Sequence, residues 1–341
     1  MQGEPQRLRD SWDRLAPMTD SIFSTPEWAD CWWRHFGEGQ EPVTLTDDAT
    51  DPTVLLPLVR SGRALRRLRF VGTERADQLG PVAAVEDQHR AATVITSAQA
   101  EGRLRADVLL LQDQPVTSTW WHPLGGTVIR RVASPTLRFP AGGWEDYLAS
   151  RSKNLRSQMR GKENRLRREH SVVTRVSVAE RLDEDLEAFW RLHLARWGES
   201  AALARGAVRA FTEDFCRVAV ERGWLRLRLL EIDGVPQAVQ LNFRYQDVES
   251  LYQGGRNAAL DGASVGFVLT TDTLRSACEE GMREFRFLRG NEDYKYRFAT
   301  VASDVHSIAV PLTRRGRLAV AVAARRAGPD APAPVELPPA D

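Results

Sequence analysis

Hydrophobic positions recur along the chain with two different periods, and the change between them separates the expected elements. Near the N-terminus, residues 26–36 place Trp28 and Trp32 on one helical face. Thr25 is a suitable N-cap, and Pro26 suits the first helical position because its missing N–H is not needed there. The pattern therefore predicts a helix whose tryptophans pack into a core.

Apolar runs of strand length follow in the first half of the chain. They predict strands at 43–46, 53–59, 65–71 and 106–112, with a helix at 86–99. Residues 125–144 lack either period and contain Pro135, Pro140 and a glycine pair, so this stretch is predicted to be irregular. The domain boundary is expected within it.

The second half has a longer version of the same order. Helices are predicted at 184–197, 208–222 and 267–280, and strands at 224–232, 236–245, 249–254 and 285–288. Asp233 and Gly234 form a hairpin turn signal between the first two of these strands. His193 lies on the apolar face of its helix, where it is either a core histidine or a catalytic base.

These elements predict a mixed α/β (α+β) fold with two domains. The first is expected at 1–140 and the second at 141–313, with a short helix and a Pro/Ala-rich tail in 314–341. The composition of 328–341 predicts a disordered tail. The similar order of elements in the two halves indicates an internal repeat, although the halves share no residue-level identity.

A strongly basic segment, residues 150–170, stands at the start of the second domain. Its lysines and arginines accompany only a thin apolar stripe that includes Leu155, Met159 and Leu166. It is either a solvated helix or a surface for the phosphates of a cofactor or a tRNA.

Charge and cysteine content narrow the classes of function. The 341 residues carry a formal net charge of +1, which gives no general attraction to nucleic acid or membranes. Cys31, Cys216 and Cys278 match no metal-ligand spacing, so no metal is expected, and the reducing cytoplasm is the expected location. No apolar run approaches the length of a membrane span, and residues 318–324 are far too short for one.

Five strings resemble those of one known family. They are STPEW at 24–28, SKNLRSQMR at 152–160, RLHLARW at 191–197, DGVPQAVQLNFRY at 233–245 and FLRGNEDYKYRF at 287–298. Together they resemble the GNAT N-acyltransferases, in particular the branch of acetyltransferases of cellulose and exopolysaccharide biosynthesis. The same tandem-GNAT architecture is found in the Fem-type aminoacyl-tRNA-dependent peptidyltransferases.

The resemblance implies two tandem GNAT-like domains, the first degenerate, and acetyl-CoA or another acyl-CoA as co-substrate. It places a bent strand at 250–254, followed by a loop and a helix whose N-terminal amides bind the pyrophosphate. Ser264, Val265 and Gly266 take that position here, although the leading Gln or Arg of the usual loop is missing. Arg256 is a candidate for the missing cation.

An aromatic-Lys-x-x-Phe motif marks the active site in the Fem-type enzymes, and residues 294–298 match it. The resemblance therefore singles out Lys295 as the catalytic residue, together with its neighbours Tyr294 and Glu292. A fixed cation at this place stabilises the oxyanion formed during acyl transfer. Glu292 is a candidate for accepting a proton, or it lies in a solvated turn.

Polar residues on nearby strands are candidates for substrate binding. Gln240 and Asn242 lie on one face of a strand and either line a cleft or face solvent. Tyr252, Arg289 and Asn154 complete the set, the last two as partners for phosphate or carboxylate groups.

Three functions are consistent with these observations. The first is acyl-CoA-dependent N- or O-acylation of a sugar, a cell-envelope precursor or a small metabolite. The second is aminoacyl-tRNA-dependent peptidyl transfer, in which the basic segment would contact RNA. The third is a non-catalytic scaffold that keeps the fold for partner binding.

Overall fold

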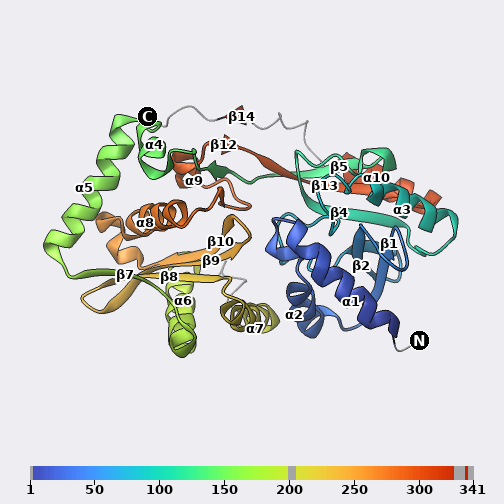
Figure 1. Ribbon diagram of the computed structural model, residues 1–341, viewed down its shortest axis with the longest axis horizontal. Coiled ribbons are helices and arrows are strands. Elements are labelled where there is room, and N and C mark those ends of the chain that lie inside the picture. The colour runs from blue at the N-terminus through green and yellow to red at the C-terminus, as the bar shows by residue number, and fades with distance from the viewer. Residues whose placement is uncertain (1–2, 199–204, 326–334, 337–341) are drawn as a thin grey trace. The chain divides into compact units, whose positions relative to one another are not determined.

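The structure is a computed structural model that describes residues 3–198, 205–325 and 335–336 (Figure 1). The chain divides into two compact units, and both are interrupted in sequence. The first contains 1–133 and 303–335, and the second contains 134–302 and 336–341. The tail predicted to be disordered lies, apart from residues 335–336, outside the described residues.

The first unit is built on a six-stranded sheet in the order β1-β2-β3-β4-β13-β5. Neighbouring strands are antiparallel, except β3 and β4, which are parallel. The strands are β1 (Glu41–Thr46), β2 (Leu55–Ser61), β3 (Arg67–Phe70), β4 (Val108–Pro115), β5 (Thr127–Ala133) and β13 (Asp304–Pro311). The helices are α1 (Gly3–Leu15), α2 (Pro26–Phe36), α3 (Arg90–Ala100) and α10 (Arg314–Ala324).

Local sequence determines α2, and the predicted bounds agree with the structure. The Thr25 side chain accepts a hydrogen bond from the Trp28 N–H, and Pro26 begins the helix. Trp28, Cys31 and Trp32 are buried, as the helical spacing predicts. This helix therefore needs no ligand to explain its tryptophans.

The irregular stretch predicted at 125–144 is ordered. It contains β5, β6 (Thr136–Arg138) and the start of α4 (Gly143–Ala149). The prediction missed these strands because their partners are distant in sequence: β5 pairs with β13, and β6 pairs with β11 (Glu284–Arg286). Consequently the boundary lies at Ser134 instead of 140, and β13 and α10 belong to the first unit instead of following the second.

The second unit is built on an eight-stranded sheet in the order β14-β12-β6-β11-β10-β9-β8-β7. The strands not yet given are β7 (Val172–Val176), β8 (Leu225–Ile232), β9 (Val235–Tyr245), β10 (Val248–Arg256), β12 (Val301–Ala302) and β14 (Val335–Glu336). The further helices are α5 (Lys153–Glu169), α6 (Leu182–Trp197), α7 (Gly206–Glu221), α8 (Val265–Glu279) and α9 (Asp293–Phe298). Helix α8 covers one face of the sheet, and α6 and α7 cover the other (Figure 1).

Strand β10 is bent where the sheet opens. Its register with β9 shifts between Leu251 and Gln253, which marks a bulge. It pairs in parallel with β11 only over residues 248–250, and then continues alone on that side to Arg256. The two strands therefore separate, and polar backbone groups of β10 remain available beyond Ser250.

The stretch after β11 differs from the prediction of a strand followed by a loop. The strand ends at Arg286, Leu288 has a positive φ of 55°, and Gly290 has a φ of 134°. The motif residues then form the short helix α9.

Among the described residues, no helix has the length and apolar character needed to cross a membrane.

Candidate functional site

A cavity of about 380 Å³ opens in the second unit beside the free end of β10. The N-terminus of α8 and one face of α9 form its other walls. Such a volume lies within the range of ligand pockets. Its polar lining includes Lys162, Arg196, Gln240, Arg256, Asp261, Ser264, Thr270, Tyr294 and Arg297.

The N-terminus of α8 contributes backbone donors to this cavity. Ser264 occupies the N-cap with a positive φ of 58°, and the first intrahelical bond runs from the Val268 N–H to the Ser264 carbonyl. The N–H groups of residues 265–267 therefore have no acceptor within the helix. They form a partial positive charge at which an anion is stabilised.

Gly266 keeps the space in front of this helix end open. A Cβ atom built on it would lie 3.2 Å from Cδ of Arg256, which is tighter than an ordinary contact. A larger side chain here would enter the cavity, so the glycine maintains access to the helix N-terminus.

Cationic side chains surround the cavity, and their charge is not balanced. Lys162, Arg196, Arg256 and Arg297 line it, together with a single acidic residue, Asp261. Asp261 already accepts two hydrogen bonds from Arg256, at 2.6 and 3.0 Å. Uncompensated cations that converge on a cavity predict an anionic ligand.

Two of these cations lie against the same ring. Lys162 Nζ is 4.7 Å and the Arg297 guanidinium 5.0 Å from the centre of the Phe267 ring. Burial, and to a smaller extent the charge of Arg297, lowers the pKa of Lys162. Lys162 also donates a hydrogen bond of 3.1 Å to Oγ of Ser264, which holds it at the α8 N-terminus.

Gln240 lines the cavity, and its side-chain oxygen is buried. Its side chain is 6% exposed, and Oε1 has no hydrogen-bond partner among the described residues. The orientation of the amide follows from its neighbours: Thr270 Oγ1 donates to the Gly266 carbonyl at 2.8 Å, so it accepts from Nε2 of Gln240 at 2.8 Å. A buried acceptor without a partner is costly, so a ligand N–H or O–H at this point would be favoured.

Tyr294 and Arg196 lie close together in the lining of the cavity. The Arg196 guanidinium lies 5.7 Å from the centre of the Tyr294 ring and 4.5 Å from that of Trp197. Burial raises the pKa of Tyr294, so its hydroxyl stays protonated at neutral pH. A protonated phenol in a cavity can donate a hydrogen bond or a proton to a leaving group.

Five of the residues predicted from sequence line the cavity together. These are Gln240, Arg256, Ser264, Gly266 and Tyr294. Val265 belongs to the same helix end through its backbone, but its side chain is buried in the core. The predicted phosphate-binding turn, with Ser264 and Gly266, and the predicted cleft residue Gln240 therefore line the same cavity.

Lys295 lies beside this cavity but is not among its lining residues. The side chain is buried, and Nζ donates to the Arg289 carbonyl at 2.7 Å and lies 3.0 Å from the carboxylate of Glu292. These contacts join α9 to the turn that contains Leu288 and Gly290. Lys295 and Glu292 thus form an ion pair at the base of the turn.

The other predicted substrate-binding residues are dispersed. Tyr252 sits at the β10 bulge with its ring 5.5 Å from that of Phe243, and Asn154 accepts from Gln158 on the exposed surface of α5. Arg289 supplies its carbonyl to Lys295. His193, the alternative candidate base, is a buried histidine whose Nδ1 lies 3.2 Å from the Gly254 carbonyl.

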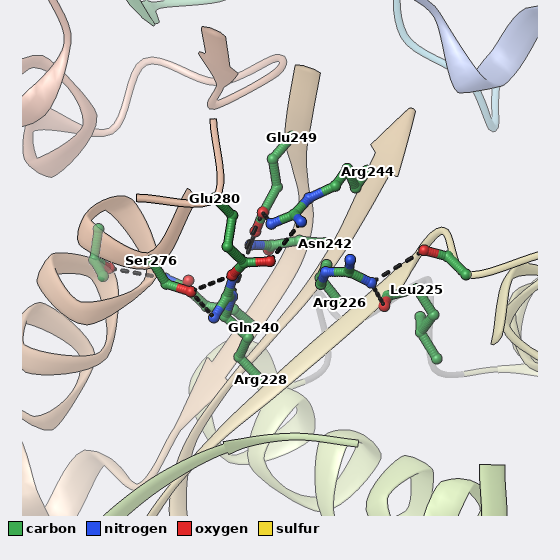
Figure 2. Close-up of polar contacts among 11 residues, drawn as sticks. Leu225, Arg226, Arg228, Gln240, Asn242, Arg244, Glu249, Ser276 and Glu280 are labelled. Carbon is green, nitrogen blue, oxygen red and sulfur yellow. Dashed lines mark hydrogen bonds and ion pairs between the residues drawn. The ribbon is translucent and has the colours of Figure 1, made fainter. Parts of the chain in front are cut away.

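Asn242 belongs to a buried charge network instead of a cleft (Figure 2). Its Nδ2 donates to Glu249 Oε1 at 2.8 Å, and Arg244 donates to Glu249 Oε2 at 3.0 Å. Arg244 also bonds Glu280 at 2.6 Å, while Arg228 reaches Glu249 at 3.4 Å. Two arginines and two glutamates thus pair with one another against the sheet, while the neighbouring Arg226 donates to the backbone carbonyls of Gly223 and Leu225.

Three lining cations were not singled out from the sequence. Lys162 was only one of many basic residues in the 150–170 segment, Arg196 follows the apolar face of α6, and Arg297 belongs to the motif of Lys295. Each comes from a different helix, so no spacing in the sequence connects them.

Among the described residues, no three His, Cys, Asp or Glu side chains are grouped so that they could hold a metal ion.

Comparison with known proteins gives one family match. Residues 153–296 match the family model described as "Acetyltransferase (GNAT) domain", and this range lies entirely within the second unit. A comparison with curated protein sequences found no match. Residues 153–296 of the second unit are therefore similar to the GNAT acetyltransferase domain family.

Solved structures resemble the whole chain at low sequence identity. FemX has a TM-score of 0.65 at 10% identity, covering 89% of this chain and 96% of that one. The L-PGS of Bacillus licheniformis has a TM-score of 0.57 at 13% identity, covering 89% and 98%. A tandem GNAT protein from the clavulanic acid biosynthesis pathway has a TM-score of 0.50 at 10% identity, covering 91% and 96%. The chain thus has a tandem GNAT-like fold, as predicted.

Proposed function

We propose that the second unit transfers an acyl group from a phosphate-bearing donor, acetyl-CoA or another acyl-CoA, to an amine or hydroxyl. The observation that carries this proposal is the cavity at the α8 N-terminus, where four cationic side chains accompany one carboxylate. Backbone N–H groups and uncompensated cations together suit the pyrophosphate of such a donor. The GNAT family match supports the same reaction class.

The lining residues divide into three roles. Lys162, Arg256 and Arg297 hold phosphate groups of the donor, together with the α8 amides. Gln240 Oε1 accepts a hydrogen bond from an amide N–H of the donor. Tyr294 donates a proton to the leaving thiolate when the acceptor has attacked the acyl carbon and the C–S bond breaks, and the proton that the acceptor nitrogen or oxygen releases restores the phenol through water.

Lys295 is proposed as a positioning residue in this arrangement. Lys295 does not line the cavity, but it directly follows Tyr294, which does. Its contacts with the Arg289 carbonyl and Glu292 fix the turn before α9. A side chain that sets the place of Tyr294 affects the rate without touching substrate. The resemblance to the exopolysaccharide branch supports a sugar, a cell-envelope precursor or a small metabolite as the acceptor.

Thermal unfolding with and without CoA and acetyl-CoA tests the proposal. A ligand at about 100 times its Kd adds roughly 2.7 kcal/mol to the free energy of unfolding. For domains of this size that raises Tm by about 5–10 °C, at about 2–4 °C per kcal/mol. Gly266→Leu fills the entrance to the α8 N-terminus and should remove the shift, whereas Gly262→Leu, on a glycine with open space around it, should keep it.

One observation favours a second candidate, an aminoacyl-tRNA donor. Lys153, Arg160 and Arg168 are exposed and follow one another at seven- and eight-residue steps, which places them on one side of α5. Such a stripe can follow a phosphate backbone. Replacing all three by Glu should abolish salt-dependent tRNA binding while leaving any CoA-induced Tm shift in place. A protein that responds to neither ligand would fit the third candidate, a non-catalytic scaffold.

A further inference from the structure

The first unit contains an aliphatic cavity of about 310 Å³ between α10 and its sheet. Nine of its ten lining residues are aliphatic, and the tenth is Arg67. Leu65 and Leu110 line it from the sheet side, and Val322 lines it from α10. Only hydrocarbon complements such walls, because they offer almost no hydrogen-bonding group.

Helix α10 is held firmly over this cavity. Thr313 caps the helix by accepting from the Gly316 N–H at 3.1 Å, and its hydroxyl donates to the buried Asp107 at 3.0 Å. A Cβ on Gly316 would lie 1.9 Å from the Asp107 carbonyl oxygen, so only glycine permits this approach. The face that α10 turns outward is therefore fixed by its inner contacts.

That outward face carries exposed aliphatic side chains. Leu318 is 73% exposed and Val322, one turn later, is 53% exposed. Val322 also lines the cavity, so the exposed ridge and the cavity wall are continuous. We call Leu318, Val322 and the cavity mouth beside them the α10 face.

Arginines surround the α10 face without acidic partners. The helix and the residue after it contain Arg314, Arg315, Arg317 and Arg325 and no acidic residue, and the neighbouring turn contributes Arg63, Arg66 and Arg67. Within residues 3–198 and 205–325, none of the seven lies within 4.0 Å of a carboxylate, although Asp107 is near Arg66 and Arg315. The oxygens of Asp107 are already bonded to the Thr313 hydroxyl and the Arg66 N–H. Seven arginines beside one nearby carboxylate leave most of the positive charge here uncompensated, in a chain whose net charge is only +1.

We propose that the α10 face binds the surface of an anionic phospholipid membrane. Leu318 and Val322 enter the interface, the arginines contact lipid phosphates, and the aliphatic cavity receives part of an acyl chain. A nucleic acid would leave the exposed Leu318 and the cavity unused. A free fatty acid would fill the cavity but leave Leu318 and most of the arginines in water. The bilayer is the ligand that satisfies all three features.

Vesicle flotation with the full-length chain tests this proposal. We expect binding to phosphatidylglycerol–phosphatidylcholine vesicles to exceed binding to phosphatidylcholine vesicles by at least about 10-fold at 0.1 M salt, and to weaken as salt rises. Leu318→Asp should reduce binding to the anionic vesicles by about 10-fold or more. Arg314→Glu combined with Arg317→Glu should reduce this binding to a similar extent because it reverses the charge. This double variant tests the proposal if Leu318→Asp fails to fold.

A matched control lies in the same unit. Val85 is 78% exposed and is followed by Glu86 and Asp87, so Val85→Asp adds the same charge at an equally exposed aliphatic position outside the α10 face. It should leave binding to the vesicles unchanged.

Three results would each overturn the proposal. They are no binding to anionic vesicles, equal losses in Val85→Asp and Leu318→Asp, and a concentration-dependent dimer that Leu318→Asp dissociates. The last result would make this face an interface between two copies. The outcome is independent of acyl transfer, because the face belongs to the other unit.

Discussion

Two polar regions of the second unit contact the same helix, yet they differ in charge balance. Near the C-terminal end of α8, Arg228 and Arg244 face Glu249 and Glu280, with Ser276 bonding both an arginine and a glutamate (Figure 2). At its N-terminus, four cations face one carboxylate across a cavity. The four charged side chains of the first set pair with one another, whereas most cations of the second have no carboxylate partner in the cavity. Charge balance therefore distinguishes polar groups that stabilise the fold from polar groups that are available to bind a ligand.

The largest expected effect comes from unbalancing the network. Arg244→Met leaves the fully buried Glu249 with fewer partners, and breaking such a pair costs about 3–5 kcal/mol of stability. Urea unfolding of the purified variant measures this loss. Arg283→Met removes a half-exposed ion pair with Asp247 in the same unit and should cost less than about 1 kcal/mol. Equal losses in the two variants would contradict the structural assignment of the network.

The cavity should show the opposite response. Lys162→Ala or Arg297→Ala removes a charge that has no carboxylate partner in the cavity, so stability should change by less than about 1 kcal/mol. The Kd for CoA should rise by about 10-fold or more, the usual cost of losing a charged hydrogen bond. Titration calorimetry gives the Kd directly.

Arg165→Ala is the matched control for Lys162→Ala. It lies on the same helix three residues later, is exposed, and pairs only with Glu169. CoA affinity should be unchanged in this variant. A cavity variant that loses stability but keeps its affinity for CoA would place these cations with the structural network.

Lys295 could belong either to the structural charges or to the groups that serve the reaction, and replacing it distinguishes the two. Lys295→Met leaves the Arg289 carbonyl and Glu292 without their buried donor, which should cost about 1–3 kcal/mol. As a positioning residue it should lower kcat and leave KM for the acyl donor nearly unchanged. Full stability together with complete loss of transfer would instead show that Lys295 acts on the substrate itself.

Local signals allowed the sequence to predict those parts of the molecule that depend on neighbouring residues. The Thr25 cap, the Asp233–Gly234 turn and the helical face of His193 are all set within one or two turns of chain. Strands β5 and β13 were not predicted correctly because their pairing joins segments about 170 residues apart in the sequence. A short strand gains its stability from such partners, which no local pattern contains.

The candidate site shows the same division. Ser264 and Gly266 could be predicted because the resemblance to the GNAT family places its pyrophosphate-binding turn at the start of this helix. The four cations come from α5, α6, β10 and α9, so only the fold brings them together. The motif predicts Lys295 as the catalytic residue, but its neighbour Tyr294 is the one that lines the cavity. A motif thus locates a site to within a residue or two, and side-chain direction decides the rest.

The smallest expected effect is the pH dependence that the balanced network contributes to stability. Its arginines hold the pKa of Glu280 at about 2, below the ordinary 4.5. Because the folded-state pKa is lowered, the stabilisation is complete above about pH 4.5 and is lost as pH falls towards 2. The side chain is 44% exposed, so solvent screening limits the contribution to about 1 kcal/mol.

Glu280→Gln isolates this contribution. The variant should be less stable than the parent at pH 7, and the difference should shrink between pH 4.5 and pH 2.5 in urea unfolding measured at each pH. The cavity has only Asp261 to titrate in this range, and Arg256 lowers the pKa of that exposed carboxylate too. Asp261→Asn should therefore alter CoA affinity more than stability. A larger loss of stability at pH 7 for Asp261→Asn than for Glu280→Gln would remove the distinction between the two regions.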